Sequence, residues 1–567
     1  MQEGKFLDKG KSEEEAEGTG EAEELGDGTG NVGKSRTEWK VAKDVISLGL
    51  IAMIVRVFCI GYTILWSRGI RNYKFSNDLL CDEHSNLWNY IRCFSYWDGE
   101  YFLRLSLNET EYLYEQNHAF FPALPLIIVY IKKLISIFLP NMSSSTCSVH
   151  MLIALIINNF FFVISVIGMY VFVYISFNNR IRNVEISSAK KKEKCSDMYY
   201  MNNIMDIENC YKFSFFVAFL YIFNIGNIHM SSFYNESIFS CLSIWGFTFL
   251  QFSKISKNMN LIFELFAVLS FSLASFFRSN GILFLIPLFI FNLSSCTFCR
   301  YCSLLLSSSM GAGKKIHLTP GSNSQIDIHK KRISKENIWI YFQNKRNFVQ
   351  FVLHWGKALI EAILVILPFI IFQSYAYHLY CVPKHNDLWK EEHKKFHNFL
   401  ISFLKNPLKY VDILNHTSQN SEFIRRPWCE KTFPFVYNYI QQKYWGVQFL
   451  KLFKSPNPNI LYAAPVYFLS FHAVYHFFIC KTFNINQPYL LLNPFLEGIL
   501  HLFVLCLYIL TFAHTEIILR LVVSSPYFYT HYAYLLKYSD KWNYFLLINL
   551  VYFFIGPPLF GTYIAWT

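Results

Sequence analysis

Long apolar runs separated by short polar segments dominate the chain from residue 44 onward. The first run, Asp44–Trp66, has Arg56 as its only interior basic residue, and it is long enough to cross a hydrocarbon core about 30 Å thick. Further apolar runs lie at about 119–139, 151–177, 213–230, 232–252, 261–293, 357–381, 460–480, 498–523 and 544–566. The pattern predicts an all-α polytopic membrane protein with roughly eight to ten transmembrane helices.

Two of these runs are not expected to form single spans. One helix over 261–293 would extend about 50 Å, and the polar sequence Arg278-Ser279-Asn280-Gly281 interrupts it. We therefore expect two short helices that meet at this break. The run 119–139 carries two prolines and two lysines, which is typical of a helix that lies at the membrane surface.

Residues 1–43 differ in composition from the rest of the chain. They are rich in Glu, Gly and Lys and contain almost no apolar side chains, so they are predicted to form a disordered tail. Basic residues directly before the first span place this tail in the cytosol by the positive-inside rule. These residues are Lys34, Arg36, Lys40 and Lys43.

The remaining basic clusters predict the sidedness of the loops in the domain 44–567. If the run 119–139 does not cross the membrane, every strongly basic segment faces the cytosol. The resulting topology has basic cytosolic insertions at 178–212 and 294–356, a large first lumenal loop at 67–150 and a second lumenal loop at 382–459.

Composition supports a membrane protein and argues against a nucleic-acid-binding protein. Hydrophobic residues make up 53% of the 567 residues and charged residues only 16%, against about 25% charged in a soluble domain. The net charge of +12 sits in short loop clusters such as Lys190-Lys191-Lys192. No aromatic and basic repeat typical of a nucleic-acid platform accompanies them, so no nucleic-acid partner is expected.

The 14 cysteines predict neither a metal site nor a particular disulfide pattern. Cys296, Cys299 and Cys302 border an apolar run and a basic loop, so we interpret them as membrane-flanking thiols rather than zinc ligands. Cys81, Cys93 and Cys429 fall in predicted lumenal segments, where disulfides are permitted, but their pairing cannot be read from the sequence. Glycosylation sequons at Asn108 and Asn415 also fall in predicted lumenal loops.

The first lumenal segment contains the sequence Trp97-Asp98-Gly99, whose aspartate is a candidate general base. Placed beside the membrane, Asp98 could accept the proton of an attacking sugar hydroxyl while a lipid-linked donor is held next to it. The alternative is structural. Asp98 could cap the helix that follows, with Glu100 and Arg104 forming a pair at i, i+4.

Polar residues near apolar runs are further candidates for a site. Glu115, Gln116 and His118 lead directly into the run 119–139, which fits either a pocket at the membrane surface or an ordinary interfacial anchor. Glu236 opens a predicted span, and Arg278 with Asn280 interrupts another. Arg278 could bind the phosphate of a lipid-linked sugar, or it could form a structural pair with Glu236.

These segments together resemble the PIG-V family, the second mannosyltransferase of glycosylphosphatidylinositol (GPI) anchor assembly. The resemblance is carried by segments in a fixed order that extends from about residue 45 to the C-terminus. They are Trp97-Asp98-Gly99 with Tyr101-Phe102-Leu103-Arg104, Glu115-Gln116 with Ala119-Phe120-Phe121-Pro122, Tyr234-Asn235-Glu236-Ser237, Phe277-Arg278-Ser279-Asn280-Gly281, and Arg426-Pro427-Trp428-Cys429 through Trp445. The chain departs from the family at His118, where an aromatic or apolar residue is usual.

The resemblance implies a GT-C-like fold, an endoplasmic reticulum membrane location and a lumenal active site. It implies dolichyl-phosphate mannose as donor and a mannosylated glucosaminyl-phosphatidylinositol lipid as acceptor, with no separate cofactor. An accessory membrane subunit is compatible with it. By the same resemblance, Asp98 is the expected base. The expected substrate-binding residues are Trp97, Arg104, Glu115, Gln116, His118, Glu236, Arg278, Asn280 and Trp428.

Two other functions are compatible with the same pattern. Another transferase that uses a dolichyl-phosphate sugar would share the spans and the lumenal acid. A transporter or scramblase would be expected to show broken helices in matching halves of the chain, and only the break at 278–281 is visible in the sequence.

Overall fold

A computed structural model describes residues 28–70, 80–81, 85–138, 146–188, 207–256, 258–299, 345–382, 394–407, 426–451, 458–479, 491, 493–564 and 566. The chain divides into two compact units, Met1–Asp44 and Val45–Thr567. In the described part, every regular element is an α-helix or a 3₁₀ helix. This confirms the predicted all-α class.

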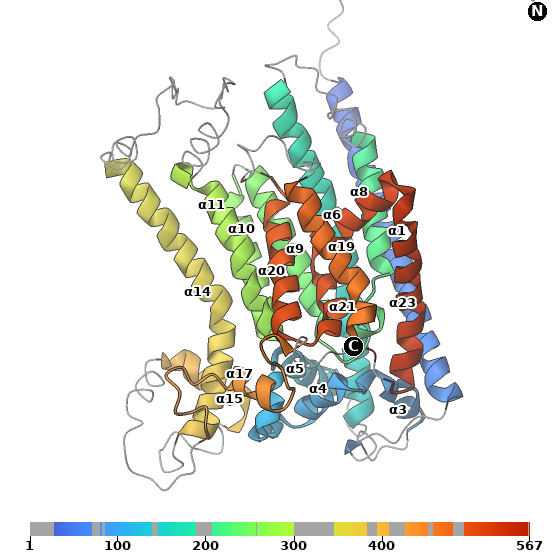
Figure 1. Cartoon of the computed structure of the whole chain (residues 1–567), viewed down its shortest axis with the longest axis vertical. Helices are drawn as coiled ribbons and strands as arrows, with labels where there is room; N and C mark the ends of the chain where they lie inside the picture. Colours follow the sequence, from blue (N-terminus) through green and yellow to red (C-terminus); the bar gives the residue numbers. More distant parts are fainter. Residues whose placement is uncertain are drawn as a thin grey trace, which may run out of the picture. The chain divides into compact units, whose positions relative to one another are not determined.

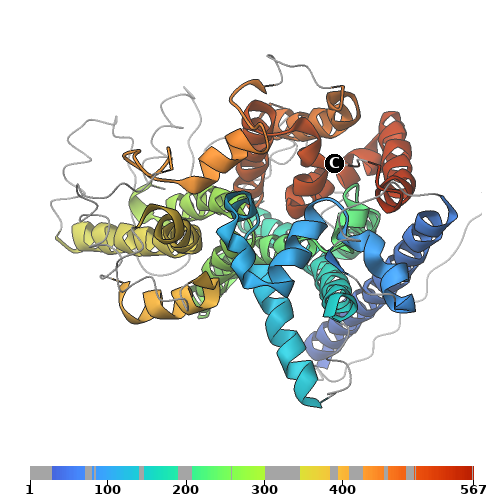
Figure 2. The ribbon, with the colours of Figure 1, turned by 90° about the horizontal axis from the view of Figure 1, so that it is seen from below.

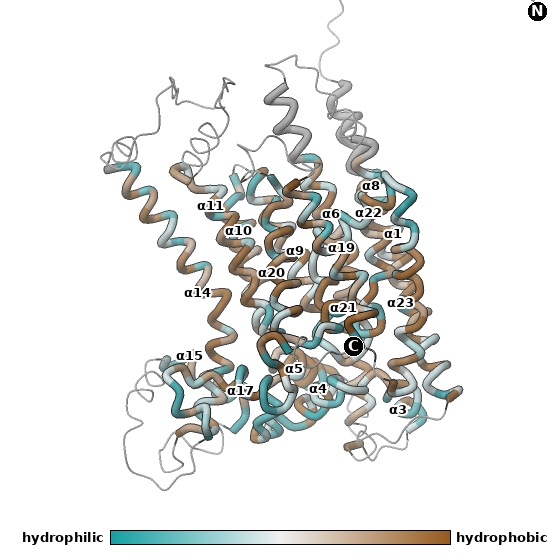
Figure 3. Tube along the Cα trace, in the orientation of Figure 1, coloured by the Kyte–Doolittle hydropathy of each residue, from teal (hydrophilic) through white to brown (hydrophobic). Residues whose placement is uncertain are grey.

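The long helices follow the apolar runs of the sequence. They are α1 (Gly28–Gly69), α6 (Thr146–Ser188), α8 (Ile207–Ile222), α9 (Glu236–Ile255), α10 (Asn260–Phe277), α11 (Leu285–Ser295), α14 (Lys345–Cys381), α19 (Ile460–Phe478), α20 (Leu496–Phe512), α22 (Pro526–Tyr538) and α23 (Asn543–Gly561). Seven of the described helices are long and apolar enough to span a membrane. Figure 3 shows that their traces are predominantly hydrophobic along the bundle. The polytopic character is therefore confirmed.

Shorter helices gather at one end of this bundle (Figure 1). They are α3 (Asn86–Ile91), η1 (Arg92–Ser95), α4 (Asp98–Leu107), η2 (Glu109–Leu113), η3 (Glu115–Ala119), α5 (Ala123–Phe138), α15 (Phe396–Lys405) and α17 (Val436–Lys443). Viewed from below, α5 is seen along its length, whereas helices in the middle of the bundle are seen nearly end-on (Figure 2). It thus lies across the bundle, as expected for the run 119–139 at a membrane surface.

The beginning of α1 corrects the predicted tail. The helix starts at Gly28, so residues 28–43 are helical and not disordered as predicted, while residues 1–27 lie outside the described part. Within the second unit, α1 contributes the buried Arg56. Its Nη1 donates to the carbonyl of Asn227 at 2.9 Å, and its guanidinium lies over the ring of Phe162. A charged group inside an apolar span is thus satisfied by backbone oxygen and an aromatic face.

The run 261–293 breaks where its polar sequence predicted. Helix α10 ends at Phe277, the 3₁₀ helix η7 (Ser279–Phe284) follows, and α11 begins at Leu285. Gly281 allows η7 to fold back against the end of α10, because a Cβ at this position would lie only 2.5 Å from the backbone N and Cα of Ser275. The break projects Arg278 from the end of α10.

The run 498–523 was predicted as one span, but the structure shows that it is broken. Helix α20 ends at Phe512, and η11 (Thr515–Ile517), α21 (Ile518–Leu521) and η12 (Val522–Ser524) follow. Helix α22 then returns into the bundle, although its mixed aromatic and polar sequence gave no apolar run. The chain therefore contains a second broken run, which the sequence did not reveal.

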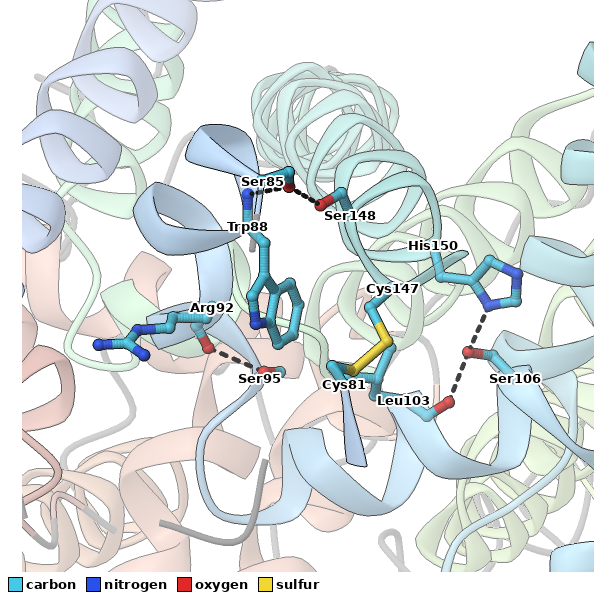
Figure 4. The surroundings of a disulfide bond; sticks show 10 residues. All are labelled: Cys81, Ser85, Trp88, Arg92, Ser95, Leu103, Ser106, Cys147, Ser148 and His150. Carbon is cyan, nitrogen blue, oxygen red and sulfur yellow. Dashed lines mark hydrogen bonds between the residues drawn. A yellow bond between two sulfur atoms is a disulfide. The ribbon is translucent and has the colours of Figure 1, made fainter. Parts of the chain in front are cut away.

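The first loop is attached to the bundle by a disulfide and a contact between two polar side chains. Cys81 is bonded to Cys147 at the start of α6 (Figure 4). In the same view, Ser106 of α4 and His150 of α6 lie 2.9 Å apart, Oγ to Nδ1. These contacts fix α4 against α6, so the first residue of α4, Asp98, has a defined position relative to the bundle.

Candidate functional site

Asp98 is the first residue of α4 and does not act as its cap. The N-cap is Trp97, which has a positive φ of 57° and makes no side-chain capping bond. The left-handed conformation is unfavourable for a residue with a bulky side chain, and such strain tends to occur at functional sites. The predicted pair between Glu100 and Arg104 is present at 2.6 Å. Asp98 itself points to a different partner.

That partner is Arg520, which lies 422 positions later in the chain. Nη1 of Arg520 donates to Oδ2 of Asp98 at 2.9 Å, while Nε and Nη2 donate to Oε1 of Glu236 at 2.7 and 2.6 Å. One guanidinium thereby joins two carboxylates from two different elements. This fork geometry is specific to arginine.

Arg278 completes a network of two arginines and two carboxylates. Its Nη1 lies 2.5 Å from Oε1 of Glu236, the same oxygen that Arg520 contacts. The structural pair considered from sequence is therefore present, but it belongs to a larger network that reaches Asp98. Asp98 is its most accessible member, with 31% of its side chain exposed against 8% for Arg520.

The turn before α9 sets the geometry of this network. The backbone N of Phe233 donates to the carbonyl of Phe94 at 2.9 Å, and the hydroxyl of Tyr234 donates to the carbonyl of Tyr96. On its other side, Nδ2 of Asn235 donates to the carbonyl of Phe277 at 2.8 Å. The turn thus joins the segment before Asp98 to the end of α10, which carries Arg278.

The environment of Arg520 keeps its guanidinium charged. Burial by itself lowers the pKa of this side chain, but the carboxylates of Glu236 and Asp98 outweigh burial and raise the pKa above its usual value. The guanidinium also lies over the ring of Tyr234 at 4.9 Å. Arg520 therefore supplies a permanent positive charge directly behind Asp98.

A cavity of about 630 Å³ opens in front of Asp98. Four segments of the chain form its walls: α4 with its N-cap, the segment through η2 and η3, the turn after α17, and the segment after α23. The lining residues are Trp97, Asp98, Glu100, Tyr101, Arg104, Glu111, Tyr114, Gln116, Asn117, Trp445 and Tyr563. The volume is in the range of small-molecule sites.

Aromatic rings form much of the cavity wall. Trp97 stacks on Tyr563 with ring centroids 4.6 Å apart, and Tyr563 also has a positive φ, of 62°. On the other side, Tyr101 contacts Trp445 edge to face at 5.6 Å. Flat aromatic faces interleaved with carboxylate, guanidinium and amide groups can hold a sugar through ring contacts and hydrogen bonds to its hydroxyls.

Four of the predicted residues, Asp98, Trp97, Arg104 and Gln116, line this cavity together. Glu236 and Arg278 lie behind it in the ionic network. Asn280 belongs to η7 and is not among the residues that line the cavity.

Glu115 and Trp428 contact each other. Both are buried and neither lines the cavity. Nε1 of Trp428 donates to Glu115 Oε1 at 2.8 Å, and the hydroxyl of Tyr444 donates to Oε2 at 3.1 Å. This pair attaches the segment carrying Trp445 to the first loop, and the disulfide Cys381–Cys429 attaches the same segment to the end of α14.

His118 also lies outside the cavity. It is fully buried among the rings of Tyr112, Phe372, Tyr375 and Tyr380, and burial lowers its pKa to about 3. A neutral imidazole stacked among aromatic rings acts as an aromatic core residue. This accounts for its presence where the resembling family has an aromatic or apolar residue.

Sequence reasoning missed Arg520, Glu111 and Tyr563. Arg520 lies near the end of the apolar run 498–523, which also contains Glu516, and an ionisable residue in such a run is the same signal that singled out Arg278. In the described part of the chain, no group of three or more His, Cys, Asp or Glu residues is arranged to hold a metal ion.

Comparison with known proteins identifies the family. The profile of the mannosyltransferase (PIG-V) family matches residues 46–188 and 326–566. The chain belongs to the PIG-V mannosyltransferase family. It is a glycosyltransferase, as the sequence predicted.

Curated relatives of this PIG-V chain extend over most of its length. It is 23% identical to GPI mannosyltransferase 2 of Drosophila pseudoobscura pseudoobscura over 489 residues, which cover 83% of this chain and 86% of the fly protein. It is 24% identical to human GPI alpha-1,6-mannosyltransferase 2, over 69% of this chain and 60% of the human protein. No solved structure matches significantly, so the GT-C-like fold stays a prediction.

The matched stretches contain Asp98 and Arg520 but not Glu236, Arg278 or Asn280, which lie between them. The structure nevertheless brings Glu236 and Arg278 to the Asp98–Arg520 pair. The ionic network of this PIG-V mannosyltransferase therefore combines residues from the stretches that match the family profile with residues from the stretch between them.

Proposed function

We propose that this chain transfers the second mannose to a GPI-anchor precursor in α-1,6 linkage, with dolichyl-phosphate mannose as donor. The relatives named GPI mannosyltransferase 2 support the acceptor class. The observation that carries the proposal is the position of Asp98. This residue lines a sugar-sized cavity, and its carboxylate is bonded to the guanidinium of Arg520.

In the proposed reaction, Asp98 is the general base. The acceptor hydroxyl attacks the anomeric carbon of the donor mannose, and the bond between that carbon and the phosphate oxygen breaks. The hydroxyl proton passes to Asp98, and dolichyl phosphate leaves with the bonding electron pair. Arg520 bonds one carboxylate oxygen, Oδ2, which orients the other oxygen for the incoming hydroxyl.

The two arginines suit the charge that the leaving phosphate develops. Arg278 and Arg520 share Glu236, so a phosphate that approaches Arg278 can compete with that carboxylate for hydrogen bonds. Arg278 is the more accessible of the two, with 19% of its side chain exposed. We infer that Arg278 contacts the donor phosphate and that Arg520 positions the base.

The proposed location is the endoplasmic reticulum membrane with the cavity facing the lumen. The disulfides Cys81–Cys147 and Cys381–Cys429 both lie at the end of the bundle that carries α3, α4 and α17, and disulfides persist in oxidising compartments. Asn108 of the first predicted sequon is exposed there, whereas Asn415 lies outside the described residues.

Complementation tests this function. Cells that lack the second GPI mannosyltransferase accumulate a precursor with one mannose, and expression of this chain should convert it to the dimannosylated lipid and restore surface GPI-anchored proteins. The Asp98→Asn chain at equal abundance is the matched control. A persistent monomannosylated precursor, with the wild-type chain correctly located and stably expressed, would contradict the proposal.

A further inference from the structure

The positive and negative charges of the side chains that line the cavity are not equal in number. They are Asp98, Glu100, Arg104 and Glu111. Asp98 is bonded to Arg520, and Glu100 is paired with Arg104. One negative charge of the cavity, that of Glu111, is left over.

Among the described residues, the carboxylate of Glu111 has no hydrogen-bond or ion-pair partner. Its hydrogen bonds in the described part are those of its backbone: the carbonyl accepts from Nδ2 of Asn117 at 2.7 Å and from the backbone N of Tyr114 at 3.0 Å. These two bonds hold the 3₁₀ turn of η2 and fix the place of the residue on the wall. Glu111 is therefore a positioned carboxylate without a counter-charge.

A carboxylate of this kind selects for a cation in its ligand. Coulomb interactions are stronger in a concave site with reduced dielectric constant than in open water. Hydrogen bonds between an ammonium group and a carboxylate are about twice as strong as those between neutral groups. A neutral ligand in the same place would leave the charge of Glu111 unpaired and partly desolvated.

The surroundings of Glu111 indicate that the cation is carried on a sugar. Tyr114 offers an aromatic face, and Gln116 and Asn117 offer amide groups on the same wall. Glu111 belongs to η2, which follows the C-terminal end of α4, whereas Asp98 opens that helix. The two carboxylates can therefore contact different sugar units of one ligand.

We propose that Glu111 recognises the protonated amine of a hexosamine in the acceptor, next to the sugar whose hydroxyl meets Asp98. This inference rests on the proposed function, whose acceptor carries glucosamine beside its first mannose. An aliphatic amine near a carboxylate is positively charged at neutral pH. Acetylation removes that charge and adds volume, so Glu111 discriminates between the free and the N-acetylated acceptor.

A pair of acceptors tests this assignment. Purified wild-type enzyme and the Glu111→Gln variant are assayed for mannosyl transfer to a synthetic mannosyl-glucosaminyl-phosphatidylinositol and to its N-acetylated analogue. We expect wild type to prefer the free amine. Glu111→Gln should lower kcat/KM for the amine acceptor roughly tenfold to a hundredfold, the range for loss of a charged hydrogen bond, and leave the acetylated acceptor almost unchanged.

Two further variants sharpen the result. Glu109→Gln changes the neighbouring carboxylate, which binds His397 and does not line the cavity, and it should keep the wild-type preference. Glu111→Asp keeps the charge and should retain part of the preference. An equal loss of rate on both acceptors in Glu111→Gln, or no loss on either, overturns the inference. Absence of transfer by wild type to both acceptors instead overturns the proposed function.

Discussion

At the residue scale, the site depends on a single guanidinium that joins two carboxylates. Arg520 contacts Asp98 with one nitrogen and Glu236 with two others. Asp98 lines the cavity with 31% of its side chain exposed, so Arg520 holds a carboxylate that a ligand can reach. The strained backbone of Trp97 places this carboxylate at the cavity wall rather than over the helix N-terminus.

Asp98→Asn separates a base from a helix cap. Asn preserves size and caps a helix as well as Asp, but it cannot accept a proton at neutral pH. Turnover should fall by roughly 10² or more while abundance stays near normal. Mannosyl transfer in membranes measures this, with the exposed Asp540→Asn as control. An Asp98→Asn enzyme that restores surface GPI-anchored proteins at low expression would end the base hypothesis.

Arg520→Lys should impair turnover nearly as much as Arg520→Ala. A lysine ammonium can contact one carboxylate but cannot span Asp98 and Glu236 in the fixed geometry of the fork. Breaking a buried pair of this kind costs about 3–5 kcal/mol, so protein abundance is measured beside activity. The exposed Arg68→Lys serves as control. Near-wild-type turnover of Arg520→Lys at normal abundance would mean that only the charge matters.

At the element scale, broken helices place the arginines. Both Arg278 and Arg520 come from interruptions of apolar runs, after α10 and after α20. The first break was predicted because four polar residues interrupt the run. The second was missed because its polar residues are spread among apolar neighbours. In the sequence, the transporter alternative was disfavoured because only one break was visible. The structure contains a second break, so it is membership of the mannosyltransferase family that favours an enzyme.

The disulfide Cys381–Cys429 should matter for substrate affinity. It attaches the segment with Trp445, a cavity wall, to the end of α14. Cys381→Ser should lower stability by about 2–4 kcal/mol and raise KM for the acceptor more than it lowers kcat. Thermal unfolding and steady-state kinetics measure the two effects, and Cys299→Ser, which removes a thiol outside any disulfide, is the control. An unchanged KM would show that the wall is held without this bond.

At the scale of the whole molecule, one membrane topology agrees with the placement of the basic clusters, with the location of the disulfides and with the position of α5. In it, the first loop faces the lumen, and the segments 178–212 and 294–356 face the cytosol. Epitope tags inserted at residues 75, 190 and 320 in sealed microsomes test this. The tag at 75 should be protected from protease and the other two digested. A protected tag at 190 would mean that α5 crosses the membrane.

The sequence by itself determined the properties that depend on neighbours along the chain. Apolar length predicted the membrane helices, the polar interruption at Arg278 predicted the first break, and the setting of Asp98 singled out the candidate base. Membrane helices form from local hydrophobicity and local hydrogen bonds, so their presence is readable in short windows. The disulfide partners and the beginning of α1 at Gly28 were not readable in this way.

Only the tertiary structure decided which of the polar residues meet. Asp98 and Arg520 come together because α4 is fixed to α6 while the broken segment after α20 packs beside α9. His118 was excluded from the cavity, and Glu111 and Tyr563 were included, by the same packing. Contacts between residues hundreds of positions apart depend on how the helices pack, and no single window of the sequence contains that information.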